Sequence, residues 1–177
     1  GKRSAYAPVV FVEPLDEVNR RALGWDGFSE PVRRDAMERA RDAGTISLTG
    51  MVRLVIEEKE KFKTGFLMYL PIYARGPAPE SVEDRRTALA GYLAAVFYTE
   101  DLLRGIFPEP VPEVSFKLYE GTDVSQETLR FSCGASRRDS GKDKTPMFES
   151  RKTLDFYGRQ WTLAFESTPL FESGVDR

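Results

Sequence analysis

The residues best suited to chemistry lie in the stretch LGWDGFSEPVRR, residues 23–34. Asp26 stands beside Trp25 and between Gly24 and Gly27, a composition typical of a turn. A carboxylate next to an indole could accept hydrogen bonds from N–H groups of a bound molecule while the ring covers its face. Asp26 could equally form the turn itself by accepting backbone N–H groups. The residues by themselves favour the second role.

Two arginines, Arg33 and Arg34, follow this turn at the start of an apparent helix. Positive charge is unfavourable there because the helix macrodipole is positive at its N-terminus. The helix buries one side, so at least one arginine is expected to point into solvent. The other could pair with Glu30 or Asp26 across the turn. We expect a structural role for both.

Few other residue types could support catalysis. The chain of 177 residues contains no histidine, which excludes Ser-His-Asp and Cys-His catalysis and histidine-ligated zinc. Cys133 is the single cysteine, so there is no intramolecular disulfide and no cysteine zinc site. Acidic pairs such as Glu57 and Glu58 lie in charge-rich segments, which are typical of a solvated surface. We expect no catalytic residue, metal site or cofactor, and a binding module rather than an enzyme.

The composition is that of a soluble globular protein, with 41% hydrophobic and 31% charged residues. The formal net charge of −2 gives no indication of nucleic-acid binding. No run approaches the roughly 20 apolar residues of a membrane span.

The first half of the chain alternates between strand and helix signals. Residues 9–12 are rich in valine and phenylalanine and predict a strand. Apolar spacing predicts a helix over residues 31–43, with Ser29 as N-cap and Gly44 as C-cap. Apolar and polar side chains alternate over residues 46–56, which predicts a strand buried on one face. Residues 64–74 are apolar on both faces and predict a central strand, joined to the preceding one through EEKEKFK as a hairpin.

The second half reads mainly as strands. Residues 87–98 fit helix or strand by periodicity, and their glycine, aromatic and β-branched residues favour a strand; residues 99–107 predict a short helix. The proline-rich segment FPEPVPE then indicates a boundary near residue 108. Strand signals follow at residues 114–121, 128–133 and, as a pair, 151–168. The predicted fold class is α+β, with antiparallel sheets in two subdomains.

The order of several segments resembles the CHASE sensory domain. The resemblance rests on LGWD, RRDAMERARDAG, LTGMVRLV, GFLMYLPIY, AGYLAAVF and GRQWTLAF, and it covers residues 6–105 best. Trp25 is a departure, because bacterial members commonly carry tyrosine there. The long helix that opens the domain in this family is also absent from the sequence, so we expect an N-terminally truncated domain.

The resemblance implies an architecture and a cellular role. CHASE domains are extracytoplasmic sensors between two membrane helices that feed histidine kinases or nucleotide cyclases. They look like two stacked PAS-like subdomains with the ligand in the membrane-distal one. Residues 1–107 would form that ligand-binding subdomain and residues 108–177 the membrane-proximal one. We therefore expect the periplasmic sensing domain of a bacterial receptor with a histidine kinase or diguanylate cyclase output.

The resemblance also implies a ligand site. Related cytokinin receptors bind N6-substituted adenines through a turn aspartate and a strand backbone, which correspond to Asp26 and Leu48. The expected ligand is an adenine-type cytokinin or another small organic molecule, and the expected oligomer is a homodimer through the missing N-terminal helix. The alternative is a dimerisation module without a small-molecule ligand. The candidate ligand contacts are Asp26, Trp25, Leu48, Met68, Tyr69 and Leu70.

Overall fold

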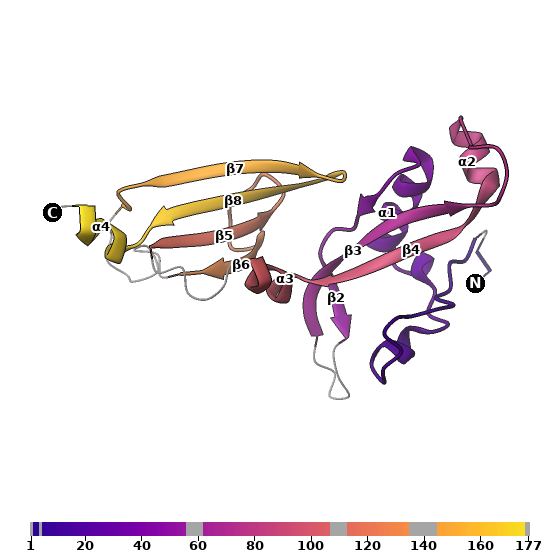
Figure 1. Cartoon of the computed structure of the whole chain (residues 1–177), viewed down its shortest axis with the longest axis horizontal. Coiled ribbons are helices and arrows are strands. Elements are labelled where there is room, and N and C mark those ends of the chain that lie inside the picture. The colour runs from indigo at the N-terminus through magenta and orange to yellow at the C-terminus, as the bar shows by residue number, and fades with distance from the viewer. Residues whose placement is uncertain (1, 4, 56–61, 107–112, 135–144, 176–177) are drawn as a thin grey trace. The chain divides into compact units, whose positions relative to one another are not determined.

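A computed structural model describes residues 2–3, 5–55, 62–106, 113–134 and 145–175 (Figure 1). The chain divides into two compact units, Gly1–Tyr98 and Thr99–Arg177. Each unit contains helices and one antiparallel sheet, which confirms the predicted α+β class. The division falls before the proline-rich segment near residue 108, because the helix α3 (Thr99–Ile106) belongs to the second unit.

The first unit is built on a long central strand, β3 (Phe62–Tyr73). The strand β4 (Leu89–Tyr98) pairs with it antiparallel, which confirms a strand over residues 87–98. The short strands β1 (Ser47–Leu48) and β2 (Val52–Val55) also pair with β3. Segments 46–56 and 64–74 are therefore neighbours in one sheet, as predicted. The predicted hairpin connection lies outside the described residues.

Segment 46–56 is interrupted between β1 and β2, and it is not half-buried throughout. Ser47, Leu48 and Thr49 are all buried, so the predicted polar face is covered here. The Ser47 hydroxyl accepts a hydrogen bond from Arg39 of the neighbouring helix at 2.6 Å. The backbone N–H of Thr49 donates to the Leu67 carbonyl, and its hydroxyl accepts from the Leu67 N–H, both at 2.9 Å. Internal polar partners thus replace solvent on that face.

The helix α1 (Pro31–Ala43) has the predicted bounds but a different N-cap. Glu30, not Ser29, caps it: the Glu30 carboxylate accepts the N–H groups of Val32 at 3.0 Å and Arg33 at 2.9 Å. Proline at the first helical position favours an extended preceding residue, which places Glu30 at the cap. The C-cap is Gly44, as predicted, in a left-handed conformation with φ of 69°.

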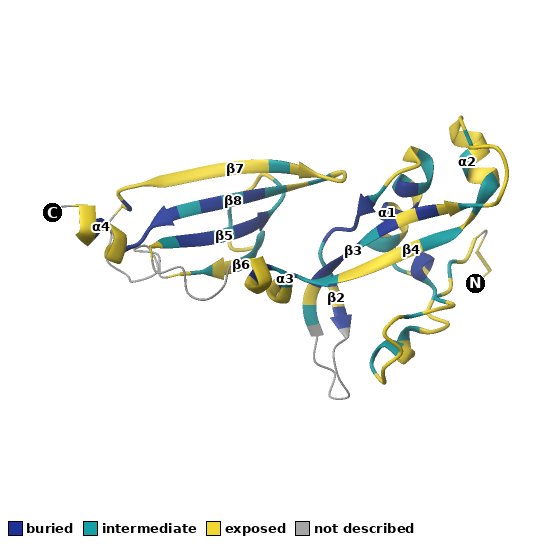
Figure 2. Cartoon of the chain, viewed as in Figure 1, coloured by how far each residue is buried: buried dark blue, intermediate teal, exposed yellow. Residues whose placement is uncertain are grey.

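The core of the first unit lies between α1 and the sheet. Ala36, Met37 and Ala40 of the helix are buried at the centre of this layer. They form one cluster with residues from β2, β3 and the turn before α1, namely Val52, Leu54, Leu67, Tyr69 and Phe28. Figure 2 shows buried segments on α1, β2 and β3.

The predicted strand at residues 9–12 is wrong. The Val9 N–H donates to the Trp25 carbonyl at 2.9 Å and the Gly24 N–H donates to the Val9 carbonyl at 2.8 Å. This segment therefore pairs with the turn rather than with the sheet. Val10 and Phe11 are 84% and 75% exposed, so their apolar character does not reflect a place in the core.

A short helix, α2 (Val82–Ala88), precedes β4 and is joined to the end of α1. Ser81 and Asp84 form a capping box at its start. Asp42 of α1 accepts hydrogen bonds from Arg86 at 2.6 Å and 3.0 Å and from Arg41 at 2.6 Å. These two arginines hold the pKa of Asp42 well below its usual range.

The second unit is a four-stranded antiparallel sheet in the order β6-β5-β8-β7. Leu103 of α3 packs with Phe116 and Leu118 in its core. The predicted strands and the closing hairpin are confirmed. The remaining elements are β5 (Val114–Glu120), β6 (Leu129–Cys133), β7 (Glu149–Phe156), β8 (Arg159–Ser167) and α4 (Pro169–Val175). Among the described residues no helix has the length and apolar character needed to cross a membrane.

Candidate functional site

The Asp26 carboxylate forms the turn before α1. One oxygen, Oδ1, accepts the backbone N–H groups of Ala7 at 2.8 Å and Phe28 at 3.0 Å. The other, Oδ2, pairs with Arg3. The hydrogen bond from Ala7 is the main cause that lowers the pKa of Asp26, with Phe28 and Arg3 acting in the same direction. Both oxygens thus already have partners within the protein.

Arg33 lies against the same turn, in the first turn of α1. Its guanidinium carbon is 4.4 Å from the centre of the Trp25 ring, in a cation–π arrangement. Its Nε is 4.0 Å from the Glu30 carboxylate, and the side chain is only 17% exposed. Arg34, by contrast, is exposed. The prediction that one arginine points outward while the other lies beside Glu30 is confirmed.

Three aromatic rings lie beneath α1. Tyr92 of β4 makes edge contacts with Phe28, at 6.3 Å between ring centres, and with Tyr69 of β3, at 6.1 Å. Burial raises the pKa of Tyr69 to about 12, although the positive charge of Arg33 opposes this shift. Burial also raises the pKa of Tyr92 to about 12. Both hydroxyls therefore stay protonated at neutral pH.

Two buried polar atoms in this region lack a hydrogen-bond partner. They are Nε of Arg33, in the first turn of α1, and the hydroxyl oxygen of Tyr92, whose charged neighbours Glu38, Arg41 and Asp42 lie in the C-terminal half of that helix. Buried polar groups are usually paired, and an unpaired one costs roughly 1–3 kcal/mol. Such atoms beside aromatic rings are what a site for a small polar molecule would contain.

The strand β4 leaves part of this face open. Ala94 and Val96 lie directly across from Tyr69 and Leu67 of β3, so they share the face that α1 covers. Tyr69 and Leu67 are buried, whereas Ala94 and Val96 are exposed, Val96 by 51%. Figure 2 shows this stretch of β4 as exposed beside the buried positions of β3. We call Ala94 and Val96 the β4 shelf.

The structure brings together only part of the predicted site. Trp25 and Tyr69 both lie beside Arg33, close to the turn that Asp26 forms. Met68 and Leu70 flank Tyr69 along β3 and therefore project to the opposite face of the sheet. Leu48 is the cross-strand partner of Met68. A ligand role for these residues stays a prediction.

Sequence reasoning missed two residues of this site. Arg33 was assigned a structural role, and Tyr92 was treated only as a strand residue. The spacing of Glu30 and Arg33 in one helical turn indicates an ion pair, and gives no sign that Nε lacks a hydrogen bond. Tyr92 reaches Phe28 only through the pairing of β3 with β4, which no local pattern predicts.

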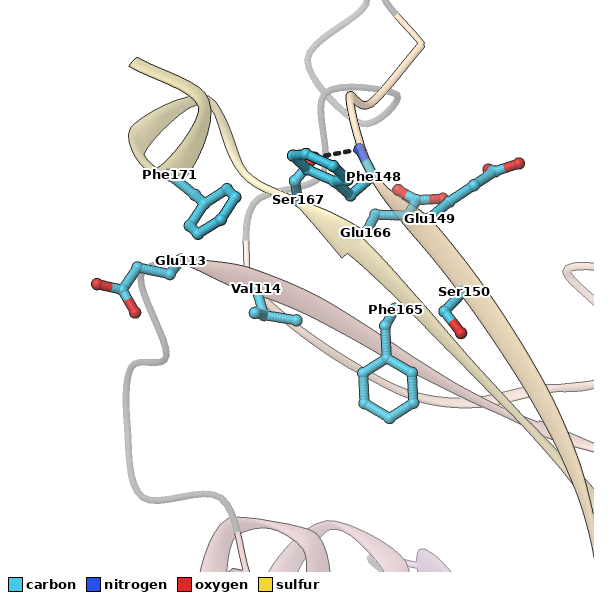
Figure 3. A pocket seen from close by; sticks show the side chains of 9 residues that line it. All are labelled: Glu113, Val114, Phe148, Glu149, Ser150, Phe165, Glu166, Ser167 and Phe171. Atoms are coloured by element: carbon cyan, nitrogen blue, oxygen red, sulfur yellow. Dashed lines mark hydrogen bonds between the residues drawn. The ribbon is translucent and has the colours of Figure 1, made fainter. Parts of the chain in front are cut away.

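A separate cavity of about 280 Å³ lies in the second unit (Figure 3). Val114, Phe165 and Phe171 provide apolar walls, and Phe148 meets Phe171 at 5.9 Å between ring centres. Glu113 and Glu149 also line it, but Figure 3 shows their carboxylates pointing away from Val114 and Phe165. Ser150, Glu166 and Ser167 line it too, and the Ser167 hydroxyl is already bonded to the Phe148 N–H and to Glu172.

Two comparisons with known proteins bear on the family. The family model of the CHASE domain matches residues 1–131. A protein of Dictyostelium discoideum named hybrid signal transduction histidine kinase A is 24% identical over an alignment of 187 positions, which covers 95% of this chain. The chain spans about 9% of the length of that relative. CHASE domains are extracellular sensory domains of receptors. The match over most of the chain shows that it belongs to the CHASE domain family.

Proposed function

We propose that this chain is the ligand-sensing domain of a transmembrane receptor and that its first unit binds a small molecule beside α1. The observation that carries the proposal is the buried, unpartnered Nε of Arg33 beside Trp25 and Tyr69, and the unpartnered Tyr92 hydroxyl extends the candidate surface along α1. Membership of a sensory family supports the same reading. The domain would have no catalytic activity of its own.

The proposed mechanism is a shift between two conformations. A ligand that contacts both α1 and β4 binds more tightly when the helix and sheet are close together. It therefore favours that conformation by the difference between its two affinities. A difference of about 5.5 kcal/mol moves a two-state equilibrium from 1:99 to 99:1.

The receptor around this domain is also part of the proposal. The relative is named as a histidine kinase, which supports a histidine kinase output, with a diguanylate cyclase as the other candidate. In a bacterial receptor the domain would be periplasmic and anchored in the inner membrane. An adenine-type cytokinin is one candidate ligand, and other small organic molecules are candidates too.

A dimerisation module is the alternative, and one surface favours it. Leu70, Ile72 and Leu93 are 39%, 48% and 61% exposed. Leu70 and Leu93 are cross-strand partners, and Ile72 lies two residues along β3, so all three share the face opposite Tyr69. Contiguous exposed apolar side chains of this kind are typical of protein interfaces. A homodimer could use this face.

A thermal-shift screen tests the sensing function. Adenines, amino acids and small organic acids are added to the whole chain, and the melting temperature is measured. A true ligand at 100 times its dissociation constant is expected to stabilise the folded state by about 2.7 kcal/mol.

A variant of the candidate site is Tyr92→Phe, which keeps the ring but removes the unpartnered hydroxyl. It should reduce the ligand-induced shift while leaving the unliganded melting temperature close to that of the wild type. If no compound of any class raises the melting temperature and sedimentation shows a stable dimer, the dimerisation module replaces the sensor.

A further inference from the structure

The free hydrogen-bonding groups of the proposed site are donors rather than acceptors. Asp26 uses both carboxylate oxygens within the protein, and Glu30 uses both of its oxygens to cap α1. At the start of α1 the unpartnered atom is the Nε of Arg33, which only donates. From this, and resting on the proposed function, we infer that the ligand carries a carboxylate that binds to Arg33.

Arg33 is well placed for an anion. The 4.0 Å between its Nε and the Glu30 carboxylate exceeds hydrogen-bond length, so Glu30 leaves that donor unused. The guanidinium also hydrogen-bonds the Tyr69 hydroxyl. Its Nε–H and a neighbouring N–H can still bind a carboxylate through two parallel hydrogen bonds. The guanidinium carbon lies 4.4 Å from the centre of the Trp25 ring, in a cation–π contact. The positive N-terminal end of α1 adds a favourable potential for a negative group.

The surroundings of Arg33 also indicate the body of the ligand. The guanidinium lies near buried Tyr69, and the β4 shelf begins at Ala94, directly across the sheet from Tyr69. Val96 continues the shelf with an exposed apolar surface. The edge of Trp25, 37% exposed, provides a second apolar wall. A molecule with a carboxylate on Arg33 would therefore rest an aromatic or aliphatic body on the shelf.

This chemistry differs from that of an adenine. The N–H edge of an adenine needs acceptors, and the two carboxylates nearest the turn already accept backbone N–H groups. The structure thus favours an apolar organic acid over a neutral base.

The test compares phenylacetate with phenylacetamide, which has nearly the same shape but no charge. Binding to the whole chain is measured by isothermal titration calorimetry at pH 7. We expect saturable binding of phenylacetate, at least roughly tenfold tighter than that of phenylacetamide, because hydrogen bonds to a charged carboxylate are stronger than those to a neutral amide. A small panel of longer aliphatic and aromatic carboxylates, each with its amide, extends the comparison.

Variants of the two neighbouring arginines locate the contact. Arg33→Gln should weaken binding of phenylacetate at least roughly tenfold and leave that of phenylacetamide unchanged. Arg34→Gln, on the exposed side of the same helix turn, removes the same charge and should leave both affinities unchanged. Arg33→Lys keeps the charge without the planar fork and should bind with intermediate affinity. Melting curves establish that each variant is folded.

The inference and the proposed function fail in different ways. Equal affinity for acid and amide, or full affinity in Arg33→Gln, overturns the carboxylate inference. The same holds if no carboxylate of the panel binds more tightly than about 1 mM. An adenine or another uncharged compound that binds while the carboxylates do not would overturn the inference but keep the sensing function. If Arg33→Gln does not fold, the comparison of acid with amide on the wild type still decides the result.

Discussion

Asp26 and Arg33 lie at one turn, to which we assign a structural role and propose a binding role. Asp26 ties the backbone of Ala7 to that of Phe28 and so fixes the turn that presents Trp25. Trp25 in turn lies against Arg33. Asp26, the carboxylate that the sequence makes the first candidate for ligand binding, stabilises the turn. Arg33, for which we expected a structural role, has an Nε–H without a hydrogen-bond partner.

The stability contribution of Asp26 should depend on pH. Replacing Asp26 by alanine removes the acceptor of two backbone N–H groups, so we expect a lower melting temperature at pH 7. The pKa of Asp26 is lowered in the folded state, so the carboxylate stabilises the fold above the pKa of an unfolded carboxyl group. That contribution is lost as the pH falls through the lowered value. The melting difference between wild type and Asp26→Ala should therefore shrink in acid.

Asp26→Asn serves as the control, because its amide oxygen can still accept the N–H groups of Ala7 and Phe28. It should melt between the wild type and Asp26→Ala. If Asp26 instead binds N–H groups of the ligand, Asp26→Asn would leave folding nearly unchanged and weaken ligand binding at least roughly tenfold, since charged acceptors make the stronger bonds. Calorimetric titration beside a melting curve separates these two outcomes.

At the scale of elements, the sheet of the first unit depends on a close approach of β3 to β4. Gly65 of β3 has no room for a Cβ atom, which would clash with the Phe97 carbonyl of β4 and the side chain of Leu54. A Cβ atom added to Gly91 of β4 would meet no atom within 4 Å. The two glycines lie in paired strands of the same sheet and therefore form a matched pair.

We expect Gly65→Ala to destabilise the chain by about 1–3 kcal/mol or more, because a backbone carbonyl cannot move aside as a side chain can. Gly91→Ala adds the same methyl group where nothing lies within 4 Å. It should be neutral or stabilise by up to about 1 kcal/mol, since glycine loses more backbone entropy on folding. Urea unfolding measures both. Equal effects at the two positions would contradict the packing argument.

The elements also show how far the sequence predicts this fold. Helix 31–43 was predictable because its apolar spacing, its capping glycine and its length agree. The strand predicted at residues 9–12 is absent, because a high β propensity reflects how well a side chain packs on a half-buried sheet and does not by itself create that sheet. Val10 and Phe11 have no such sheet to join. The polar residues Ser47 and Thr49 looked solvent-facing until Arg39 and Leu67 supplied their partners.

The site was less predictable than the fold for a related reason. Trp25 could be singled out from the turn because it is a neighbour of Asp26 in the chain. The contact of Tyr92 with Phe28 joins residues that are far apart in sequence and depends on the β3–β4 register. A single sequence predicts elements well when their signals are local. It predicts a site poorly when the site is assembled by strand pairing.

At the scale of the whole molecule, each unit has its own hydrophobic core, one around Met37 and Tyr69 and the other around Phe116 and Leu118. The two tryptophans of the chain are divided between them, with Trp25 in the first unit and Trp161 in the second. When one tryptophan is replaced by phenylalanine, the fluorescence of the remaining tryptophan therefore reports on its own unit. A unit with its own core can unfold as a separate cooperative step.

Gly65→Ala tests that separation. In a Trp161→Phe background the fluorescence of Trp25 should show unfolding at clearly lower urea after Gly65→Ala, because the clash lies in the first unit. In a Trp25→Phe background the Trp161 transition should keep its midpoint, because the second core loses no contact. Gly91→Ala should move neither transition downward. If Gly65→Ala lowers the Trp161 midpoint as much as that of Trp25, the two units unfold together. A conformational change at Arg33 would then be coupled energetically to the second unit.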